Sequence, residues 1–311
     1  MAEKMENIIQ TSHLTKRYGS KIAVNDLNLS IHKGEVFGLL GPNGAGKTTT
    51  LKLLSGILYP TSGEVLVNGF VPWERKNEFK RSFAIVMGQK NQLWWDLPAS
   101  DSLYLNKCIY DVDDREYKKT VDELSELLGV RELMNIQVRR LSLGERMKME
   151  ILAALIHRPG ILFLDEPTIG LDIVSQQKIR DFLHYYNEQT KTSVILTSHY
   201  MRDIEALCSR AVIINSGTLV YDGALSDINH RMGDKRLLTL SFSSPVENGK
   251  LSVFGRVREN KDLTAVLEIP KERIKETASQ MLSLFPVDDF TVTEVPLEES
   301  IARIFTGEVT G

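Results

Sequence analysis

The chain has 311 residues, 42% of them hydrophobic, which is enough for a sizeable core and roughly two domains. Its net charge of -3 shows no basic excess, which argues against nucleic acid as a partner. Cys108 and Cys208 match no metal or redox spacing, so we expect reduced thiols in a cytosolic protein. The charged N-terminus lacks a secretory signal, and no run approaches the roughly 20 apolar residues of a membrane helix. Any membrane role must therefore come through a partner.

The first part of the chain predicts strands that lead into a glycine-rich loop. Short apolar or alternating runs predict strands over residues 8–14, 24–31, 36–40 and 64–67, the last followed by an Asn-Gly turn. The strand over 36–40 runs directly into the loop, and residues 47–58 after it predict a helix. This order of strand, loop and helix is the context that a phosphate-binding loop requires.

The middle of the chain predicts a helical insert between strands. Residues 83–87 predict a strand, whereas from about 93 to 155 the apolar residues recur at helical spacing. Strands are predicted again over 161–164, 194–197, 211–214 and 218–221. Strands that alternate with helices and read as apolar runs indicate an α/β sheet that is at least partly parallel. We therefore expect one domain over residues 1–228 with a helical insert at about 90–158.

The last part of the chain predicts a small α+β domain over residues 229–311. The composition changes at 227–235, which we interpret as a linker. Strands are predicted over 237–242, 253–257, 263–269 and 290–295, and helices over 271–285 and 297–305. The first of these helices is amphipathic, with Ile274, Met281 and Phe285 among the residues on its apolar face.

The glycine-rich loop fits the pattern G-x-x-x-x-G-K-[ST]. Its residues are Gly41, Pro42, Asn43, Gly44, Ala45, Gly46, Lys47 and Thr48. Glycines let the backbone curl so that several N–H groups point at phosphate oxygens, and the following helix directs its positive end at the same charge. Lys47 would contact the β- and γ-phosphates, and Thr48 would supply a hydroxyl to Mg²⁺. By itself the loop predicts a nucleotide site, without identifying the nucleotide.

Two acids, Asp165 and Glu166, follow the apolar strand predicted at 161–164. Phosphoryl transfer depends on a metal ion, positioning and charge stabilisation more than on covalent chemistry. Asp165 would hold Mg²⁺ directly or through water, and Glu166 would orient or deprotonate the attacking water. Without the loop upstream, two acids after a strand would usually cap a helix.

The segment Leu141-Ser142-Leu143-Gly144-Glu145 predicts a capped helix. Ser142 and Glu145 have the spacing of a capping box, at the start of a helix that runs to about residue 157. A capped helix N-terminus is an anion site. It cannot easily serve phosphates of its own subunit that already lie on the helix starting at Lys47.

The LSLGE segment also resembles the LSGGQ signature of ABC-transporter ATPases, and the resemblance covers roughly residues 7–223 in family order. It implies a P-loop NTPase ABC ATPase core with an antiparallel β subdomain. It also implies a head-to-tail dimer, with the same chain or a paired ATPase subunit, that encloses two ATP molecules. Ser142 and Gly144 would then contact the nucleotide of the partner subunit. Leu143 departs from the family, which usually has glycine at this position.

The resemblance implies roles for further residues. Tyr18 matches the aromatic residue that stacks on adenine, and Thr49 extends the phosphate loop. Gln89 matches the glutamine that contacts Mg²⁺ and the attacking water, and His199 matches the histidine near the γ-phosphate. Asp172 lies in the segment that joins the two sites across the dimer.

Trp94 and Trp95 follow Gln89 in the stretch GQKNQLWWDLP. In the family this region lies near the groove that receives a helix of the membrane subunit. Aromatic residues are favoured at interface hot spots, and two adjacent indoles cannot easily both face one core in an extended segment. We expect one of them to anchor this membrane subunit, the permease. The alternative is that both pack within the helical insert.

The stretch LFLDEPTIGL and the C-terminal extension resemble ATP-binding subunits of ABC-2-type exporters, in particular the daunorubicin-resistance-like bacterial ATPases. The resemblance implies a peripheral subunit at the cytoplasmic face of the membrane that powers an integral-membrane permease. Two alternatives remain: an importer ATPase, or a non-transport ABC ATPase that acts on nucleic acid or ribosomes. The second typically has two cassettes, a coiled-coil insertion or zinc cysteines, whereas this chain has one phosphate loop and no cysteine pair.

Overall fold

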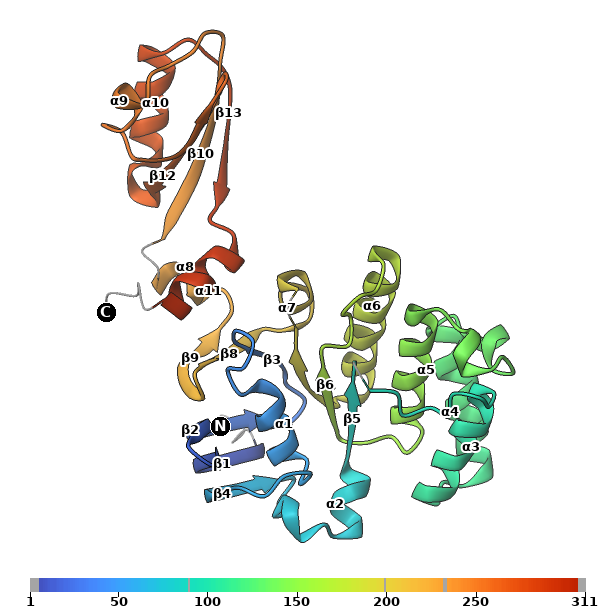
Figure 1. The fold of residues 1–311 in the computed structure, drawn as a ribbon. Helices are drawn as coiled ribbons and strands as arrows, with labels where there is room; N and C mark the ends of the chain where they lie inside the picture. Colours follow the sequence, from blue (N-terminus) through green and yellow to red (C-terminus); the bar gives the residue numbers. More distant parts are fainter. Residues whose placement is uncertain (1–5, 89, 199, 232–233, 307–311) are drawn as a thin grey trace, which may run out of the picture. The chain divides into compact units, whose positions relative to one another are not determined.

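A computed structural model of the chain describes residues 6–88, 90–198, 200–231 and 234–306. The chain forms two compact units, Met1–Gly223 and Ala224–Gly311 (Figure 1). The division falls near the end of a strand at 223, whereas the composition suggested 228. Among the described residues, no helix is both long and apolar enough to cross a bilayer.

A six-stranded sheet organises the N-terminal unit, in the order β5-β6-β7-β3-β8-β9. Its strands are β3 Val36–Leu40, β5 Phe83–Met87, β6 Ile161–Asp165, β7 Ser193–Thr197, β8 Arg210–Asn215 and β9 Thr218–Ala224. The pairs β5–β6, β6–β7, β7–β3 and β3–β8 are parallel. The carboxyl ends of β3, β6 and β7 therefore meet at one edge of the sheet, which is where open α/β sheets bind ligands.

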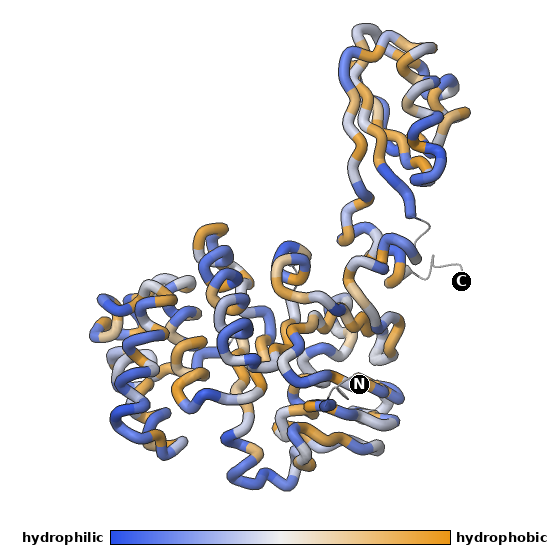
Figure 2. The backbone as a smooth tube through the Cα atoms, turned by 180° about the vertical axis from the view of Figure 1, so that it is seen from behind, coloured by the Kyte–Doolittle hydropathy of each residue, from blue (hydrophilic) through white to orange (hydrophobic). Residues whose placement is uncertain are grey.

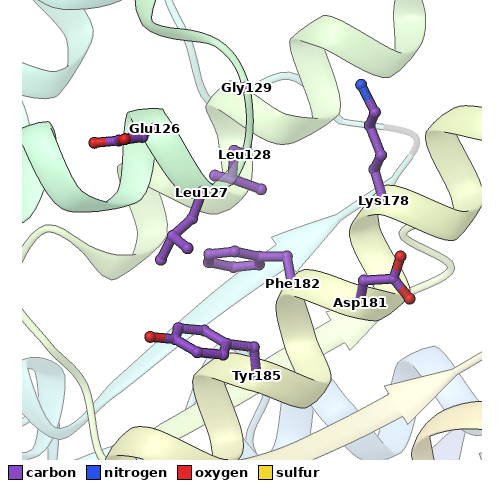
Figure 3. Close-up of a pocket in the computed structure, with 8 residues that line it drawn as sticks. All are labelled: Glu126, Leu127, Leu128, Gly129, Lys178, Asp181, Phe182 and Tyr185. Carbon is purple, nitrogen blue, oxygen red and sulfur yellow. The ribbon is translucent and has the colours of Figure 1, made fainter.

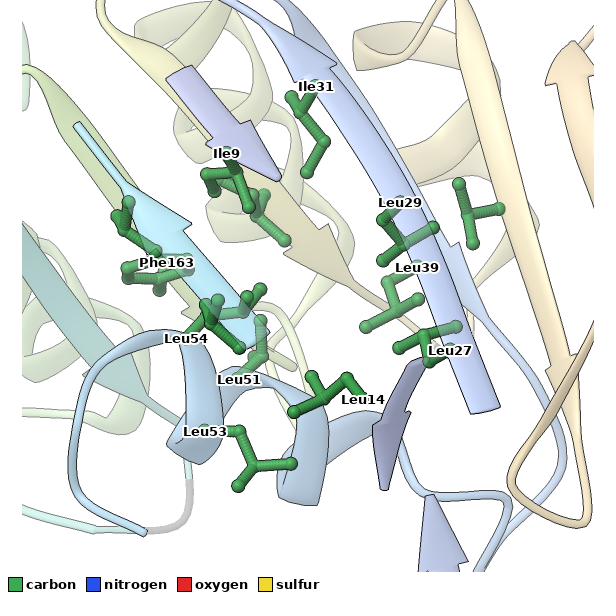
Figure 4. Packing of buried hydrophobic residues seen from close by; sticks show 14 of the residues in the cluster. Ile9, Leu14, Leu27, Leu29, Ile31, Leu39, Leu51, Leu53, Leu54 and Phe163 are labelled. Atoms are coloured by element: carbon green, nitrogen blue, oxygen red, sulfur yellow. The ribbon is translucent and has the colours of Figure 1, made fainter. Parts of the chain in front are cut away.

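A three-stranded antiparallel sheet packs against the same core. Its strands are β1 Asn7–Tyr18, β2 Lys21–His32 and β4 Ser62–Val67, in the order β2-β1-β4. The helix α1 (Lys47–Leu54) contributes Leu51 and Leu54 to a buried cluster that also contains Ile9 of β1 and Phe163 of β6 (Figure 4). The cluster joins the two sheets and the helix after the glycine-rich loop in a single hydrophobic core. α1 is shorter than the predicted helix over 47–58, because Gly56 turns the chain with φ +70°.

Helices occupy the segment between β5 and β6. They are α3 Ala99–Tyr110, α4 Asp114–Leu127 and α5 Leu143–Leu155, with short 3₁₀ turns η2 Arg131–Leu133 and η3 Val138–Arg140. Elsewhere in the unit lie η1 Pro72–Glu74, α2 Asn77–Ser82, α6 Ile173–Thr190 and α7 Met201–Leu207. Hydrophobic residues gather along the central strands, while the surrounding helices alternate between hydrophilic and hydrophobic residues (Figure 2). This alternation is the pattern of helices that bury one face.

The C-terminal unit is a four-stranded antiparallel sheet with helices. Its elements are α8 Asp227–Arg231, β10 Lys235–Phe242, α9 Asn248–Leu251, β11 Arg256–Lys261, β12 Thr264–Pro270, η4 Lys271–Arg273, α10 Ile274–Leu284, β13 Val287–Glu294 and α11 Leu297–Thr306. The strand order is β11-β12-β10-β13. Leu238, Leu240 and Met281 belong to a separate hydrophobic core of this unit.

Two local predictions in this unit are wrong. Residues 253–255 are not a strand, because the chain turns there: Val253 is 76% exposed, and a side chain on Gly255 would collide with Glu268. The segment 227–235 is not a plain linker, because α8 forms in it and buries Ile228. Asn229 of the same helix donates to the Val295 carbonyl at 3.2 Å. Residues 227–231 therefore belong to the folded unit.

Candidate functional site

The glycine-rich loop joins β3 to α1 at the carboxyl edge of the sheet. Gly41, Gly44 and Gly46 all have positive φ, at 158°, 79° and 110°. A side chain on Gly41 would collide with the Ile214 carbonyl, and one on Gly46 with the Ala23 carbonyl. Glycine is therefore required both by the backbone conformation and by the close packing of the loop on its neighbours.

Lys47 begins α1, and its ammonium group lies over the loop. The residue is 6% exposed, and its Nζ donates to the Gly41 carbonyl at 2.7 Å and to the Pro42 carbonyl at 3.2 Å. Burial lowers the pKa of Lys47, while the nearby carboxylates of Glu166 and Asp165 oppose that shift. The loop therefore concentrates a positive group where the N–H groups of a helix N-terminus also favour an anion.

Thr48 and Asp165 meet at the end of β6. Thr48 Oγ1 donates to Asp165 Oδ2 at 2.9 Å, and Thr197 Oγ1 at the end of β7 donates to Asp165 Oδ1 at 2.7 Å. A hydroxyl and a carboxylate are hard oxygen donors of the kind Mg²⁺ takes with substrate phosphates. Within the described residues no group of three or more His, Cys, Asp and Glu side chains could form an all-protein metal cage. The donor set therefore fits a metal ion shared with a nucleotide.

Glu166 has a left-handed backbone conformation with φ 56°, which is uncommon for a residue other than glycine. Its N–H donates to the carbonyl and to Oγ1 of Thr197 at 3.0 and 3.1 Å. Residues held in this region by their surroundings occur often at functional sites. Here the turn directs Glu166 to the wall of two adjoining cavities.

The first cavity, of about 250 Å³, is lined by Tyr18, Lys21, Ala23, residues 43–49 and Glu166. The second, of about 210 Å³, is lined by Thr48, Lys52, Met87, Gly88, Lys90, Asp165 and Glu166. The structure thus brings Tyr18, Thr49 and the loop together with both acids. Lys21, Lys52 and Lys90 were missed by the sequence analysis, because single lysines outside a motif carry no signal of their own.

Gln89 and His199 lie outside the described residues, and only their neighbours can be placed. The N–H of Gly88 donates to the Asp165 carbonyl at 2.8 Å. The N–H of Tyr200 donates to Ser198 Oγ at 3.0 Å. The chain on one side of each residue is therefore tied to the end of β6 or β7.

The predicted capping box at the start of α5 is confirmed. Glu145 N–H donates to Ser142 Oγ at 3.3 Å, and Ser142 N–H donates to Glu145 Oε2 at 2.8 Å. Ser142 and Gly144 line neither of the two cavities around the loop. The structure does not bring this helix end to the phosphate loop of the same chain.

The N-terminus of α5 instead packs on the N-terminus of α6. Asp172 caps α6 by accepting bonds from Ser175 N–H at 2.9 Å and from Ser175 Oγ at 2.7 Å. A side chain on Gly144 would collide with that same Ser175. Gly144 is therefore required for close contact between the two helix ends, and Asp172 lies beside the LSLGE segment.

A buried ionic network, which the sequence analysis missed, lies behind the site. Asp203 is fully buried, accepts from Arg180 Nη1 at 2.7 Å and from Ser198 Oγ at 2.8 Å, and is also hydrogen-bonded to Thr168 Oγ1. It joins the segment after Glu166 to the segment after β7. An isolated Asp in the pattern of a surface helix gives no hint of this burial.

Trp94 and Trp95 are 56% and 44% exposed, so they do not both pack inside the helical insert. The guanidinium of Arg146 in α5 lies 5.2 Å from the ring centroid of Trp95, a cation–π contact. Trp94 N–H donates to Ser102 Oγ in α3 at 3.0 Å. The backbone here is anchored while the indoles reach the surface.

One further cavity lies away from the glycine-rich loop, between the end of α4 and α6 (Figure 3). Phe182, Leu127 and Leu128 face one another in it, with Lys178 and Asp181 on its α6 side. None of its lining residues belongs to the motifs described above.

Comparisons with known proteins agree with this geometry. A family model described as "ABC transporter" matches residues 24–169, and one described as "EvrA-like ABC transporter, C-terminal domain" matches residues 234–293. The chain is similar to the ABC transporter ATP-binding protein NatA of Bacillus subtilis, with 38% identity over 66% of this chain and 83% of that protein. It is also similar to the linearmycin resistance ATP-binding protein LnrL of Bacillus subtilis, with 36% identity over 76% of this chain and 75% of that protein. Among solved structures, cbiO1 from Clostridium perfringens, part of the ABC transporter complex cbiONQ, has a TM-score of 0.64 and 25% identity over 73% of this chain and 96% of that chain.

Proposed function

The chain belongs to the family of ABC transporter ATP-binding proteins, and from this premise we propose that it powers an ABC-2-type exporter by binding and hydrolysing ATP. One observation carries the catalytic part of the proposal. Thr48 and Asp165, from different elements, are hydrogen-bonded at 2.9 Å next to the buried Lys47 and the walls of the cavity. This is the arrangement of cation, hydroxyl and carboxylate that phosphoryl transfer uses.

Each group has a defined task. The loop N–H groups and Lys47 bind the phosphates, and Tyr18 stacks on the adenine. Thr48 and Asp165 would hold Mg²⁺, together with Gln89 as the family resemblance implies, and the ion would neutralise charge on the phosphates. Glu166 orients the attacking water and accepts its proton, and His199 contacts the γ-phosphate. The left-handed turn at Glu166 supports its role, because it brings the residue to the wall of both cavities around the phosphate loop.

The working unit is a head-to-tail dimer, of two copies or of this chain with a paired ATPase subunit. Support comes from the helix N-terminus at Ser142 and Gly144, which is capped, favours anions and lies away from the loop of its own chain. In the dimer this end contacts the nucleotide of the partner. Asp172, which caps α6 next to Gly144, lies where the two sites communicate.

The permease docks at the surface around Trp94 and Trp95, and a cavity of about 390 Å³ on the same unit extends the docking surface. That cavity is lined by Ile57, Asn77, Lys80, Arg81, Phe83, Ile85, Ile109 and Tyr110. Gln92, just before the tryptophans, donates from Nε2 to the Ile85 carbonyl at 2.6 Å and so joins the two surfaces. Exposed apolar and aromatic groups beside a hollow are what an inserted helix needs. The ATPase therefore acts as a peripheral subunit at the cytoplasmic face of the membrane.

The decisive experiment is Mg²⁺-dependent ATP hydrolysis by the purified chain and by Glu166→Gln. We expect the variant to bind ATP and to lose turnover by about 10²–10⁴-fold, the usual contribution of a positioned general base. Glu188→Gln, which changes an exposed glutamate on α6, is the matched control and should behave as wild type. Equal turnover in Glu166→Gln and wild type would refute the catalytic assignment. A second experiment tests co-purification of the chain with a permease encoded beside its gene, and substrate efflux by the pair. Co-purification with efflux is expected of an exporter and not of an importer or a non-transport ATPase.

A further inference from the structure

Residues 92–95, here called the strap, are held by two buried side chains from two helices. The N–H groups of Gln92 and Leu93 donate to Glu150 Oε1 in α5 at 2.8 and 3.3 Å. The next N–H, of Trp94, donates to Ser102 Oγ in α3 at 3.0 Å. Glu150 is 3% exposed and Ser102 is 5% exposed. Three successive amides of an irregular segment therefore have dedicated acceptors.

Burial of the carboxyl group of Glu150 costs free energy, so a structural reason for this residue is needed. Its Oε2 has no hydrogen-bond partner among the described residues, and burial raises the pKa of the carboxyl group against the two N–H bonds at Oε1. An apolar residue would fill the same place without that desolvation penalty. In the part of the chain that the structure describes, the hydrogen bonds that Glu150 accepts are those from the strap, and these bonds give a reason for a carboxylate at this place.

Arg146 makes a second contact from the same face of α5. It lies four residues before Glu150, and its guanidinium covers the ring of Trp95 at 5.2 Å. α5 begins at Leu143, seven residues before Glu150, which is about 10 Å along a helix at 1.5 Å per residue. One short, rigid helix thus bears the LSLGE segment at its end and the strap on its side.

We propose that Glu150 is a positioning residue that transmits movement between the N-terminal end of α5 and the strap, with Arg146 as the second link. This inference rests on the proposed function, in which the partner subunit's nucleotide binds at the N-terminal end of α5 and the permease binds at the strap. Closure on the helix end shifts α5, and because Glu150 and Arg146 hold the strap to that helix, Trp94 and Trp95 move with it. Ser102 fixes the strap to α3 and does not take part in the link.

The test uses this chain of 311 residues with two substitutions, which together make the reference chain. Glu166→Gln retains ATP, and Trp73→Phe leaves Trp94 and Trp95 as the source of the whole tryptophan signal. Dimer formation with Mg²⁺-ATP is measured by light scattering, and the ATP-induced change in tryptophan emission is measured on the same samples. We expect Glu150→Ala to form the dimer but to lose the emission change. Glu150→Gln keeps an acceptor oxygen and should retain the change, as should the matched control Ser102→Ala, which frees Trp94 from α3 alone.

The results separate the two proposals. If the reference chain forms no dimer with ATP, either by itself or with a paired ATPase subunit, the proposed function fails. If the dimer forms but ATP does not change the tryptophan emission of the reference chain, the inference is overturned. It is also overturned if Glu150→Ala keeps the full emission change. Loss of the emission change in Glu150→Gln or Ser102→Ala, in addition to Glu150→Ala, overturns it as well. If Glu150→Ala does not fold, the same emission change is measured in Arg146→Ala, which alters a half-buried residue of α5. A reduced change supports the link, and an undiminished one overturns it.

Discussion

The side chain of Leu143 lies against Gly170 of the same chain. A Cβ built on Gly170 would stand 3.2 Å from Leu143 Cδ2, so the end of the Leu143 side chain lies close to Gly170. The isobutyl group that departs from the family signature therefore packs toward the segment leading to Asp172. In this position it lies between the LSLGE segment and the segment after Glu166.

We expect Leu143→Gly to preserve ATP-driven dimerisation but to alter the ATP concentration that produces it. The variant loses the contact with Gly170 and places glycine in the first turn of a helix. Its free energy of unfolding should fall by about 1–2 kcal/mol, since Leu143 is only partly buried. Light scattering against ATP concentration and urea unfolding measure the two effects. Identical dimerisation and turnover in the variant and wild type would show that position 143 is neutral.

Thr48 tests the metal assignment through a pair of variants. Thr48→Ala removes the hydroxyl that donates to Asp165, whereas Thr48→Ser retains it. We expect the alanine variant to need about 10–100-fold more Mg²⁺ for half-maximal ATP hydrolysis, and the serine variant to stay near wild type. Removal of Mg²⁺ with EDTA should abolish turnover in all three proteins. Equal Mg²⁺ requirements for Ala and Ser would contradict metal binding by this hydroxyl.

The buried network around Asp203 predicts a large loss of stability. Asp203→Ala leaves the guanidinium of Arg180 buried without its partner, which costs about 3–5 kcal/mol in comparable sites. Asp181→Asn, which changes an exposed acid of the same α6 helix, serves as the control and should change stability little. Urea unfolding followed by tryptophan fluorescence measures both, because Trp73, Trp94 and Trp95 all lie in the N-terminal unit. A loss no greater than that of the control would show that the network is not stabilising.

Glu268 predicts an acid-dependent stability confined to the C-terminal unit. Burial opposes its ionisation, but hydrogen bonds from Arg303, Lys235 and Arg258 outweigh burial and hold its pKa at about 2. Because the folded pKa lies below the ordinary value of 4.5, the carboxylate stabilises the fold fully above about pH 4.5. That stabilisation falls as the pH decreases from 4.5 toward 2.

The variant Glu268→Gln removes this dependence and leaves three cations around a neutral side chain. We expect it to lower the urea midpoint seen by circular dichroism at pH 6, and to differ progressively less from wild type toward pH 3. The transition seen by tryptophan fluorescence is an internal control, since it reports the other unit. A constant difference between the two proteins over this pH range would be inconsistent with a depressed pKa.

The local motifs determined most of what the sequence could predict. The loop at Gly41 to Thr48, the acids after β6 and the capping box at Ser142 each depend on neighbours within a few residues, so their geometry follows from their spacing. The strand and helix order follows from apolar periodicity for the same reason. The family resemblance supplied the dimer and the permease, which a single chain cannot show.

The contacts that the sequence did not predict all join distant segments. Glu150 and Asp203 look like ordinary solvated acids on amphipathic helices, and only the packing of those helices against the strap or against α6 buries them. Leu143 and Gly170 meet because α5 and α6 start side by side, which no local pattern encodes. Val253 illustrates the opposite error of prediction. Its apolar pattern predicted a strand, but the residue lies in an exposed turn.

Asn229 has a consequence for how such a chain can be assembled in evolution. It lies at the beginning of the C-terminal unit, yet it donates to the Val295 carbonyl and accepts from Ser300 Oγ at 2.7 Å near the end of that unit. The entry and exit of the polypeptide are thereby fastened together by buried bonds. A fold whose ends meet in this way can be added, exchanged or moved as a block, because its own closure does not depend on the sequence to which it is joined.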